Sequence, residues 1–557
     1  MKYKSNFLTY IILSFLILFN ITIRYPKGDY ESGMDTFSNF SRANTLIYNG
    51  SEITILNFFS YFGLYPFSYN TGGTFLLSTT SLVSSLGISF SMLTLNYYLT
   101  ILSILSCFFL CRRINRNLLF FIILVTLFST QRTFLEGTRW SYSFRTVFVS
   151  MIPIFYHILI SLPTAYEEGK IYKYIFLVSF LCLALFSIHR IFLFALITLL
   201  VFSLSLLSYN SFIKNFSHKS TRHQISFILP LLFLSFSMLI FPFTRYGFYG
   251  IGLINFSIER GQEYFLEDRN LWISMINISL QYAMSLGFFT VLAPIGYVYL
   301  IRKVRFTHID NFLIFSLLSF TFFWPDIIYT RTYFSLLIIL YITFGLYNLL
   351  IHLPENIKKG KYVIMFIIIL TSVQLSPDYI IVSNQEPDFE EYPVKIETQP
   401  SVFNTAMHQK YMFSSSPQVT NVGFIGSKVA AYSGTHSPKV PESFTNSNLD
   451  LLSLSTLLGY DVNYIFDVDS PYSNNLEYDV YLPGYSIYDT RTELSFKNIF
   501  GTNESTYNIV VANFALESYE SRFYNNLTVF PFFQEVNSDL YKTYDGGLIQ
   551  TRFLTFK

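Results

Sequence analysis

The 557-residue chain has few charged residues and few cysteines. Asp, Glu, Lys and Arg make up 13% of it, against about 25% in soluble domains, while 52% of its residues are hydrophobic. This composition excludes an ordinary soluble domain and predicts a polytopic α-helical membrane protein. The net charge is only +2 and the basic residues are dispersed, so nucleic acid is not an expected partner.

The three cysteines, Cys107, Cys111 and Cys182, all lie in or beside apolar runs. Cys107 and Cys111 are spaced to share a helix face, but no further metal ligand is nearby, which favours ordinary apolar packing. The C-terminal part has no cysteine and therefore no disulfide framework. No P-loop, GxGxxG, HExxH or paired CxxC motif occurs, which disfavours nucleotide-driven transport and zinc hydrolysis. No GxSxG or Cys-His arrangement indicates acyl transfer.

Eleven apolar runs are long enough, or nearly so, to cross a bilayer. The first follows Lys2 and Lys4 and is not followed by a small-residue cleavage site, so it predicts an uncleaved helix with its N-terminus in the cytoplasm. The runs cover residues 7–23, 92–111, 118–131, 143–161, 172–187, 190–208, 224–243, 280–301, 311–325, 332–351 and 361–376.

The distribution of basic residues agrees with this count, because every loop that it places inside is basic. An odd number of spans then places the C-terminus outside. The apolar stretch 73–89, which is rich in Ser and Thr, is expected to lie at the membrane interface, since a span there would place Arg112, Arg113 and Arg116 outside. The basic residues of the inside loops are Arg112, Arg113, Arg116, Lys170, Lys173, Lys214, Lys219, Arg222, Arg302, Lys303, Arg305, Lys358, Lys359 and Lys361.

The composition changes near residue 377, where Asp, Glu, Asn, Ser and Pro become common. The chain is therefore divided into a multi-span membrane domain, 1–376, and an extracytoplasmic domain, 377–557, of the usual size for one fold. The short apolar stretches 419–425 and 507–512 predict strands. A mixed α/β domain is expected.

The first outer loop, 24–91, carries three acidic residues, Asp29, Glu31 and Asp35. Asp35 begins a helical pattern that runs to Gly50. One interpretation is structural, because an acidic residue at a helix start caps it or gains from the helix dipole. The other is chemical: a carboxylate at the membrane surface acts as a general base on an acceptor hydroxyl or amine that attacks a sugar anomeric carbon. The helical pattern places Phe37, Phe40, Ala43 and Ile47 on one side.

This first loop resembles that of the GT-C membrane glycosyltransferases, which include protein mannosyltransferases, aminoarabinose transferases and oligosaccharyltransferases. The resemblance covers residues 1–117. Thr36 follows Asp35, where the family often has Glu. No Asp-x-Asp motif occurs in the loop, although Asp29-Tyr30-Glu31 is a near variant. Whether the protein depends on a divalent cation is therefore left open. No Trp-Trp-Asp occurs in the tail, which argues against an oligosaccharyltransferase. The matching features are Asp35, the helix to Gly50, Tyr65-Pro66-Phe67, Gly72-Gly73-Thr74, Leu76–Gly87 and Arg112-Arg113.

The resemblance implies a sugar donor carried on a polyprenyl phosphate, so basic residues at outer span ends are expected to hold the carrier phosphate. The alternative is that each of them pairs with a lipid headgroup or a nearby acid, as Arg331 with Asp326. An unpaired charge near the hydrocarbon core costs free energy, which favours phosphate binding by these basic residues as a group. The expected phosphate ligands are His189, Arg190, Arg331, Arg139 and Arg245.

The predicted protein is thus a cell-membrane glycosyltransferase of the cell envelope, with Asp35 as base and Asp29 or Glu31 assisting. Its acceptor is a glycan, a lipid or a protein. One alternative is a transporter or flippase of lipid-linked saccharides, which requires ionisable residues inside the spans, where His157 is one of few. Another is a membrane-anchored surface-binding protein in which the tail carries the function.

Overall fold

A computed structural model gives two compact units: Met1–Tyr25 with Asn96–Arg139 and Phe144–Val382, and Pro26–Leu95 with Trp140–Ser143 and Ser383–Lys557. The structure describes residues 2–26, 31, 33–50, 61–62, 70–189, 191–209, 286–303, 307–317, 327–353, 360, 403, 406–407, 410–411, 418–420, 423–435, 479–481, 487–489, 506–512, 533–535, 544–545 and 549–556.

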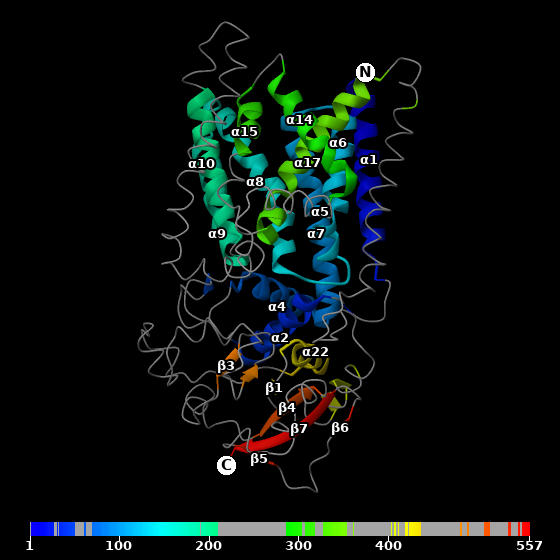
Figure 1. Cartoon of the computed structure of the whole chain (residues 1–557), viewed down its shortest axis with the longest axis vertical. Coiled ribbons are helices and arrows are strands. Elements are labelled where there is room, and N and C mark those ends of the chain that lie inside the picture. Colours follow the sequence, from blue (N-terminus) through cyan, green and yellow to red (C-terminus); the bar gives the residue numbers. More distant parts are fainter. Residues whose placement is uncertain are drawn as a thin grey trace, which may run out of the picture. The chain divides into compact units, whose positions relative to one another are not determined.

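The first unit is helical in its described part, and most of the predicted spans coincide with helices (Figure 1). The predicted runs 224–243 and 361–376 lie outside the described residues. Helix α5 begins in the second unit and continues into the first. The helices are α1 (Lys2–Ile23), α5 (Ile88–Ile114), α6 (Leu118–Thr130), α7 (Arg132–Glu136), α8 (Phe144–Glu167), α9 (Ile171–Ile188), α10 (Phe192–Ser208), η2 (Gly287–Val291), α14 (Leu292–Ile301), α15 (His308–Ser316) and α17 (Ile327–Ile351).

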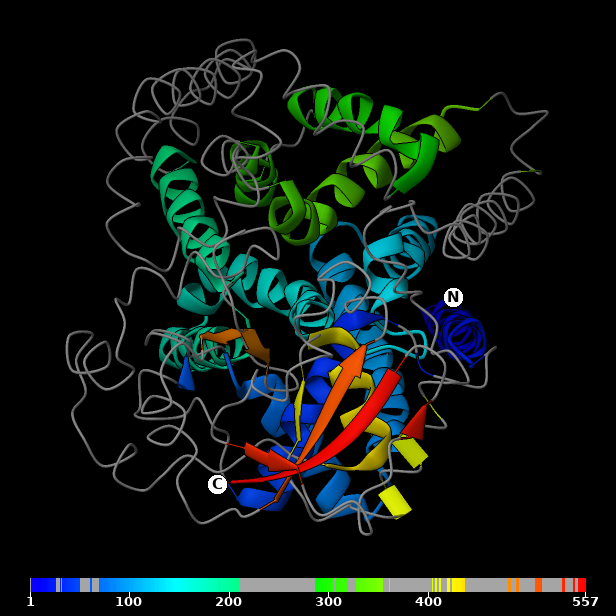
Figure 2. The same cartoon turned by 60° about the horizontal axis from the view of Figure 1, so that its bottom comes forward.

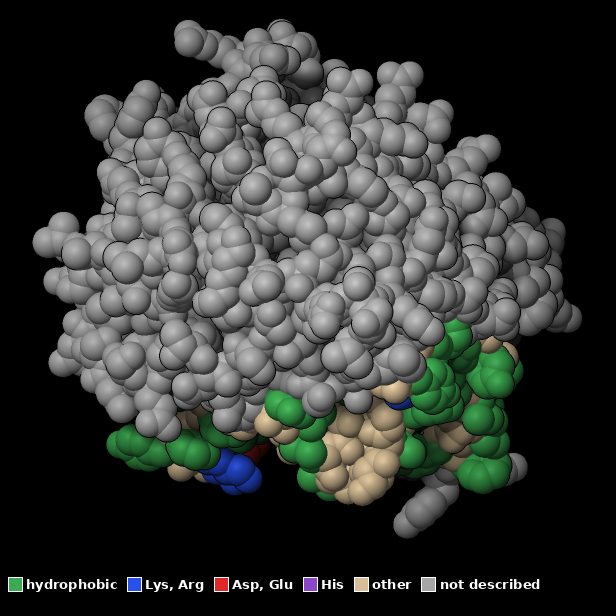
Figure 3. Space-filling view, turned by 90° about the horizontal axis from the view of Figure 1, so that it is seen from below, with side chains coloured by type: hydrophobic (Ala, Val, Ile, Leu, Met, Phe, Trp, Pro, Cys, Tyr) green, Lys and Arg blue, Asp and Glu red, His purple; other side chains and the backbone are tan. Residues whose placement is uncertain are grey.

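Four apolar segments in the described part of the chain are long enough to cross a membrane: α5, α8, α9 and residues 332–351 of α17. The surface of α9 fits lipid, since this helix leaves a row of large apolar side chains exposed at helical spacing, Tyr172, Phe176 and Phe180. In the view of Figure 3 the described side chains in sight are mostly hydrophobic or uncharged. The chain is therefore a multi-span membrane protein, while its orientation in the membrane stays a prediction.

Helices α14 and α17 cross at unusually close range because each has a glycine at the contact (Figures 1 and 2). A Cβ added to Gly296 would overlap the carbonyl oxygen of Tyr341, and one added to Gly345 would lie 2.6 Å from the carbonyl oxygen of Leu292. Small residues allow such approach between membrane helices. The Tyr297 and Tyr341 rings pack beside the crossing, with centroids 5.4 Å apart.

Arg24, directly after α1, fixes that end of the helix to the segment that follows α6. Its buried guanidinium donates to Thr138 Oγ1 at 2.7 Å, to the Ser129 carbonyl oxygen at 2.6 Å and to Asn20 Oδ1 at 2.8 Å, and it lies 5.0 Å from the centroid of the Phe134 ring. Burial lowers the pKa of Arg24 to about 9, so the group is charged at neutral pH. The start of the first loop, at Arg24, and the segment that follows α6 are therefore in contact at one end of these helices.

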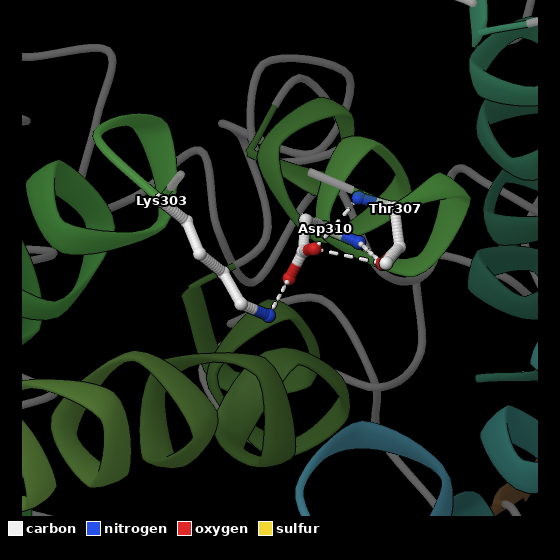
Figure 4. A network of polar contacts seen from close by, with 3 residues as sticks. All are labelled: Lys303, Thr307 and Asp310. Atoms are coloured by element: carbon white, nitrogen blue, oxygen red, sulfur yellow. Dashed lines mark hydrogen bonds and ion pairs between the residues drawn. The ribbon is translucent and has the colours of Figure 1, made fainter. Parts of the chain in front are cut away.

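The loop between α14 and α15 is closed by a polar network (Figure 4). The buried Asp310 accepts from Lys303 Nζ at 2.7 Å and from the backbone and hydroxyl of Thr307 at 2.9 and 2.7 Å, and its own N–H donates to the Thr307 hydroxyl. This is a capping box, which satisfies the free N–H groups of the helix start. Lys303, assigned to a basic inside loop, thus has a structural partner.

The second unit contains the helix predicted to follow Asp35. Helix α2 (Met34–Asn49) packs against α4 (Gly72–Ser84) and α22 (Gly423–Ser433). Its buried face is Phe37, Phe40, Ala43 and Leu46, so the expected apolar face is confirmed with Leu46 taking the place of Ile47. The predicted interfacial stretch 73–89 covers α4 from its second residue on and the first two residues of α5.

The described strands of the second unit form one sheet of order β3-β2-β1-β4-β7-β5, with β6 also paired to β7 (Figures 1 and 2). Strands β1 and β4 are parallel and the other pairs are antiparallel; β4 and β7 pair from Thr506↔Thr555 to Ala512↔Ile549. The strands are β1 (Gln418–Thr420), β2 (Asp479–Tyr481), β3 (Ile487–Asp489), β4 (Thr506–Ala512), β5 (Phe533–Glu535), β6 (Tyr544–Asp545) and β7 (Ile549–Phe556).

Of the two strands predicted in the tail, 507–512 is confirmed as β4, and 419–425 is wrong in its second half. Strand β1 ends at Thr420, and α22 begins at Gly423. Short apolar runs do not distinguish a strand from a buried helix, and here Val429 and Ala430 continue the apolar face of a helix beyond the run. The division of the chain at residue 377 and the α/β character of the whole tail stay predictions.

Candidate functional site

Asp35 lies in the first turn of α2, on a backbone set by two glycines. Gly33 precedes the helix at φ 85°, and Gly50 ends it at φ 73°, where its N–H donates to the Leu46 carbonyl oxygen at 3.0 Å. Both φ values favour glycine. Gly33, not Asp35, is the N-cap, and no side chain caps the helix there. The capping role considered for Asp35 is thus not what the structure shows, whereas the helix dipole still favours its negative charge.

The Asp35 carboxylate is held by a residue from the segment before α8. Ser143 Oγ donates to Asp35 Oδ2 at 2.8 Å, across 108 positions of sequence. Asp35 is half-buried. A hydroxyl hydrogen bond to a carboxylate is stronger than one between neutral groups, so Ser143 fixes the orientation of the carboxylate.

Ser143 is itself placed by the residue before it. The Tyr142 N–H donates to Thr36 Oγ1 at 2.8 Å, and Asn39 Nδ2 donates to the Tyr142 carbonyl oxygen at 3.2 Å. The Tyr142 hydroxyl donates to the Gly73 carbonyl oxygen at 2.9 Å. Burial raises the pKa of Tyr142, which keeps it a neutral donor. Three bonds to α2 and α4 thus lock the backbone that carries Ser143.

Glu31 is buried and accepts a hydrogen bond from the tail. The Tyr432 hydroxyl on α22 donates to Glu31 Oε2 at 2.7 Å. The Phe37 ring contacts the Tyr432 ring, with centroids 5.6 Å apart, and Lys428 Nζ lies 5.4 Å from the Phe37 centroid. The acidic loop of the first 50 residues is therefore built together with a helix of the tail.

We expect Tyr432→Phe and Glu31→Gln each to lower the free energy of unfolding by about 1–2 kcal/mol, because each weakens or removes one buried hydrogen bond to a carboxylate. Phe at position 432 keeps the ring contact with Phe37, so the loss of stability in this variant measures the hydrogen bond to Glu31. The double variant should lose less free energy of unfolding than the sum of the two single losses. Thermal unfolding of all three variants in detergent measures the difference as a coupling energy. Strict additivity would contradict the pairing.

The predicted phosphate ligands are described only in part. His189, in the first unit, is buried at the end of α9, and its Nδ1 accepts the Ile191 N–H at 3.1 Å. The neutral ring then carries its proton on Nε2, which makes it a donor without positive charge. Arg139 is half-buried and forms no hydrogen bond or ion pair with the described residues. Arg331 lies in the first turns of α17, and nothing is described of its side chain.

Asp29, Arg190 and Arg245 lie outside the described residues, so the roles predicted for them stay predictions. Among the residues that the structure describes, no group of three or more His, Cys, Asp or Glu side chains is arranged to hold a metal ion. Asp35 and Glu31 are brought to the start of one helix. Sequence reasoning missed Ser143, Tyr142 and Tyr432, although Arg139, from the same segment as Tyr142 and Ser143, is among the expected phosphate ligands.

The sequence matches no protein-family model and no curated protein. Solved structures are similar in fold. One is the oligosaccharyltransferase of Archaeoglobus fulgidus tethered to an acceptor peptide with the NVT sequon. The match covers 98% of the present chain and 74% of that protein, with a TM-score of 0.51 and 11% sequence identity. The chain also covers 98% of ArnT from Cupriavidus metallidurans bound to undecaprenyl phosphate, over its full length, with a TM-score of 0.48 and 9% identity.

Proposed function

We propose that this chain, which has the fold of the GT-C membrane glycosyltransferases, transfers a sugar from a polyprenyl-phosphate carrier to an acceptor outside the cytoplasm. The observation that carries the proposal is the carboxylate of Asp35, held by Ser143 at the start of an amphipathic helix. A carboxylate with a fixed orientation and a half-exposed position suits proton transfer with a bound acceptor.

In this reaction the acceptor hydroxyl or amine attacks the anomeric carbon, and the bond between that carbon and the phosphate oxygen breaks. Asp35 takes the proton from the attacking group, and the carrier leaves as the polyprenyl phosphate. The negative charge of Asp35 also stabilises the positive charge that develops on the sugar ring. Ser143 holds the carboxylate throughout and exchanges no proton.

Basic residues and His189 are assigned to the carrier phosphate. Arg139 retains unused donors within the described part of the chain, and an Arg with free N–H groups suits phosphate oxygens. His189 is buried and its Nδ1 accepts the Ile191 N–H, so we assign its Nε2–H, the donor of a neutral ring with this tautomer, to the phosphate. The roles proposed from the sequence are kept for Asp29, which assists the base, and for three phosphate ligands, Arg190, Arg245 and Arg331. Glu31 is a buried acid that supports the loop.

The direct test is an assay with purified chain in liposomes and radiolabelled polyprenyl-phosphate hexoses. Label is expected to move from the lipid to an acceptor in the membrane or at its surface. Glu168→Gln is the matched control, because Glu168 is an exposed acid paired with Lys170. If no lipid-linked hexose loses its sugar with any glycan, lipid or peptide acceptor, the proposal is wrong.

We expect Ser143→Ala to reduce transfer about tenfold, the size of effect that follows from losing one charge-assisted hydrogen bond. The fold should persist, since the bonds of Tyr142 to Thr36, Asn39 and Gly73 remain. Ser143→Thr keeps the hydroxyl and should restore most of the rate. Initial transfer rates measure both variants; equal loss in Ala and Thr would show that Ser143 acts by packing alone.

A further inference from the structure

Trp140 holds a backbone conformation that is unfavourable for its side chain. Its φ is +51°, and among the described residues Ser85 is the only other non-glycine residue with positive φ. Ser85 follows α4 at the C-cap, where left-handed residues are common. Trp140 has no such explanation, because α7 already ends at Glu136 with Gly137 as its C-cap. Strain of this kind concentrates at functional sites.

The indole of Trp140 adds a second unfavourable feature. Its Nε1–H is one of eleven buried side-chain polar atoms that have no hydrogen-bond partner among the described residues. A buried donor without an acceptor destabilises a fold, and native proteins contain few of them. Tryptophan is also scarce in this chain, with 3 residues against 62 Phe and 43 Tyr. Phenylalanine at this position would fill similar space without leaving a donor unsatisfied.

Trp140 begins the segment that holds the candidate base, within the same compact unit. The next residue, Ser141, lies against Gly33, with its Cβ 3.4 Å from where a glycine Cβ would stand. Three positions on, Ser143 donates to Asp35. Three peptide units span at most about 11 Å between Cα atoms, so the Trp140 backbone lies close to the Asp35 end of α2.

We propose that Trp140 contacts the sugar of the lipid-linked donor: its indole N–H donates to a sugar hydroxyl oxygen, and its ring packs on the apolar face of the sugar. The inference rests on the proposed function and deepens it, because it assigns recognition of the saccharide to one residue. Binding then supplies the acceptor that the described part of the chain does not provide. Indole rings combine a large apolar surface with one donor, which suits a sugar ring.

The test compares wild type with Trp140→Phe, which keeps an aromatic ring and removes the donor. Binding of a short-chain polyprenyl-phosphate hexose, in mannose and glucose forms, is measured by the rise in melting temperature over a concentration series, beside the bare polyprenyl phosphate. The variant should bind the sugar-bearing lipid about tenfold more weakly, as expected for one lost hydrogen bond. It should bind the bare lipid as wild type does, and its own melting temperature should be unchanged or higher.

Ser85→Gly is the control, since Ser85 is the other described non-glycine residue with positive φ and lies at the end of α4; the substitution should leave both affinities unchanged. Equal affinity of Trp140→Phe and wild type for the hexose lipid, or equal loss for both lipids, would overturn the proposal. So would failure of wild type to bind either hexose lipid. If wild type binds the hexose lipid but transfers nothing, the proposed transfer is wrong while the role of Trp140 in sugar binding stands.

Discussion

Asp35→Asn is expected to abolish sugar transfer, with a loss of about 10²–10⁴-fold, the range that general-base catalysis contributes. Asn has the same shape, and its amide oxygen still accepts the hydrogen bond that Ser143 donates. What disappears is the capacity to take a proton and the negative charge near the sugar. The position of α2 should therefore be kept while the chemistry is lost. Initial rates of transfer from a labelled lipid-linked hexose measure the effect.

Two comparisons make this result specific. Asp35→Ala removes the accepted hydrogen bond as well and should be no more active than Asn, while its melting temperature falls slightly. Glu168→Gln removes an acid that is 51% exposed and paired with Lys170, and should retain the wild-type rate. A fully active Asp35→Asn enzyme would show that the carboxylate is not the base.

Gly296→Ala is expected to have the largest effect on stability, about 3 kcal/mol, at the upper end of what overpacking of a well-packed core costs. The new methyl group would overlap the backbone carbonyl of Tyr341, and a backbone atom cannot turn aside as a side chain does. Helix α14 must then move away from α17. The contact of the Tyr297 and Tyr341 rings is lost with it. Gly345→Ala should act in the same direction, because its Cβ would approach the Leu292 carbonyl oxygen.

The matched control is Gly87→Ala, because a Cβ at Gly87 meets nothing within 4 Å. Its melting temperature in detergent should equal that of wild type. Should Gly296→Ala melt with wild type as well, the close crossing of α14 and α17 would not contribute to stability.

The helices of the first unit were predictable because long apolar runs form helices in a bilayer whatever their neighbours are. The helix after Asp35 was predictable from the spacing of Phe37, Phe40 and Ala43, which are buried. The stretch 419–425 was not, since a run of seven residues across Gly423 fits a strand or a helix start equally well. The local hydrophobic pattern therefore predicts helices and strands where the apolar run is long, and it does not distinguish them where the run is short.

The contacts of the candidate site were beyond local pattern. Ser143 is one serine among many in a polar segment, and Tyr432 is one tyrosine among 43. Each is distinguished only by the group that it meets, Asp35 and Glu31, which lie 108 and 401 positions away. A single sequence carries no signal for pairings at such separation. The acid at the start of α2 was identifiable because its own neighbours in sequence marked it.

The bond between Tyr432 and Glu31 bears on how the protein is made. The ribosome finishes the first loop long before it reaches the helix that completes it, 401 positions later. At about 5–20 residues per second, synthesis of the intervening chain takes about 20–80 s. During that interval Glu31 lacks the hydrogen bond from Tyr432, so we expect the acidic loop of a chain released before residue 432 to be less stable than in the full-length protein.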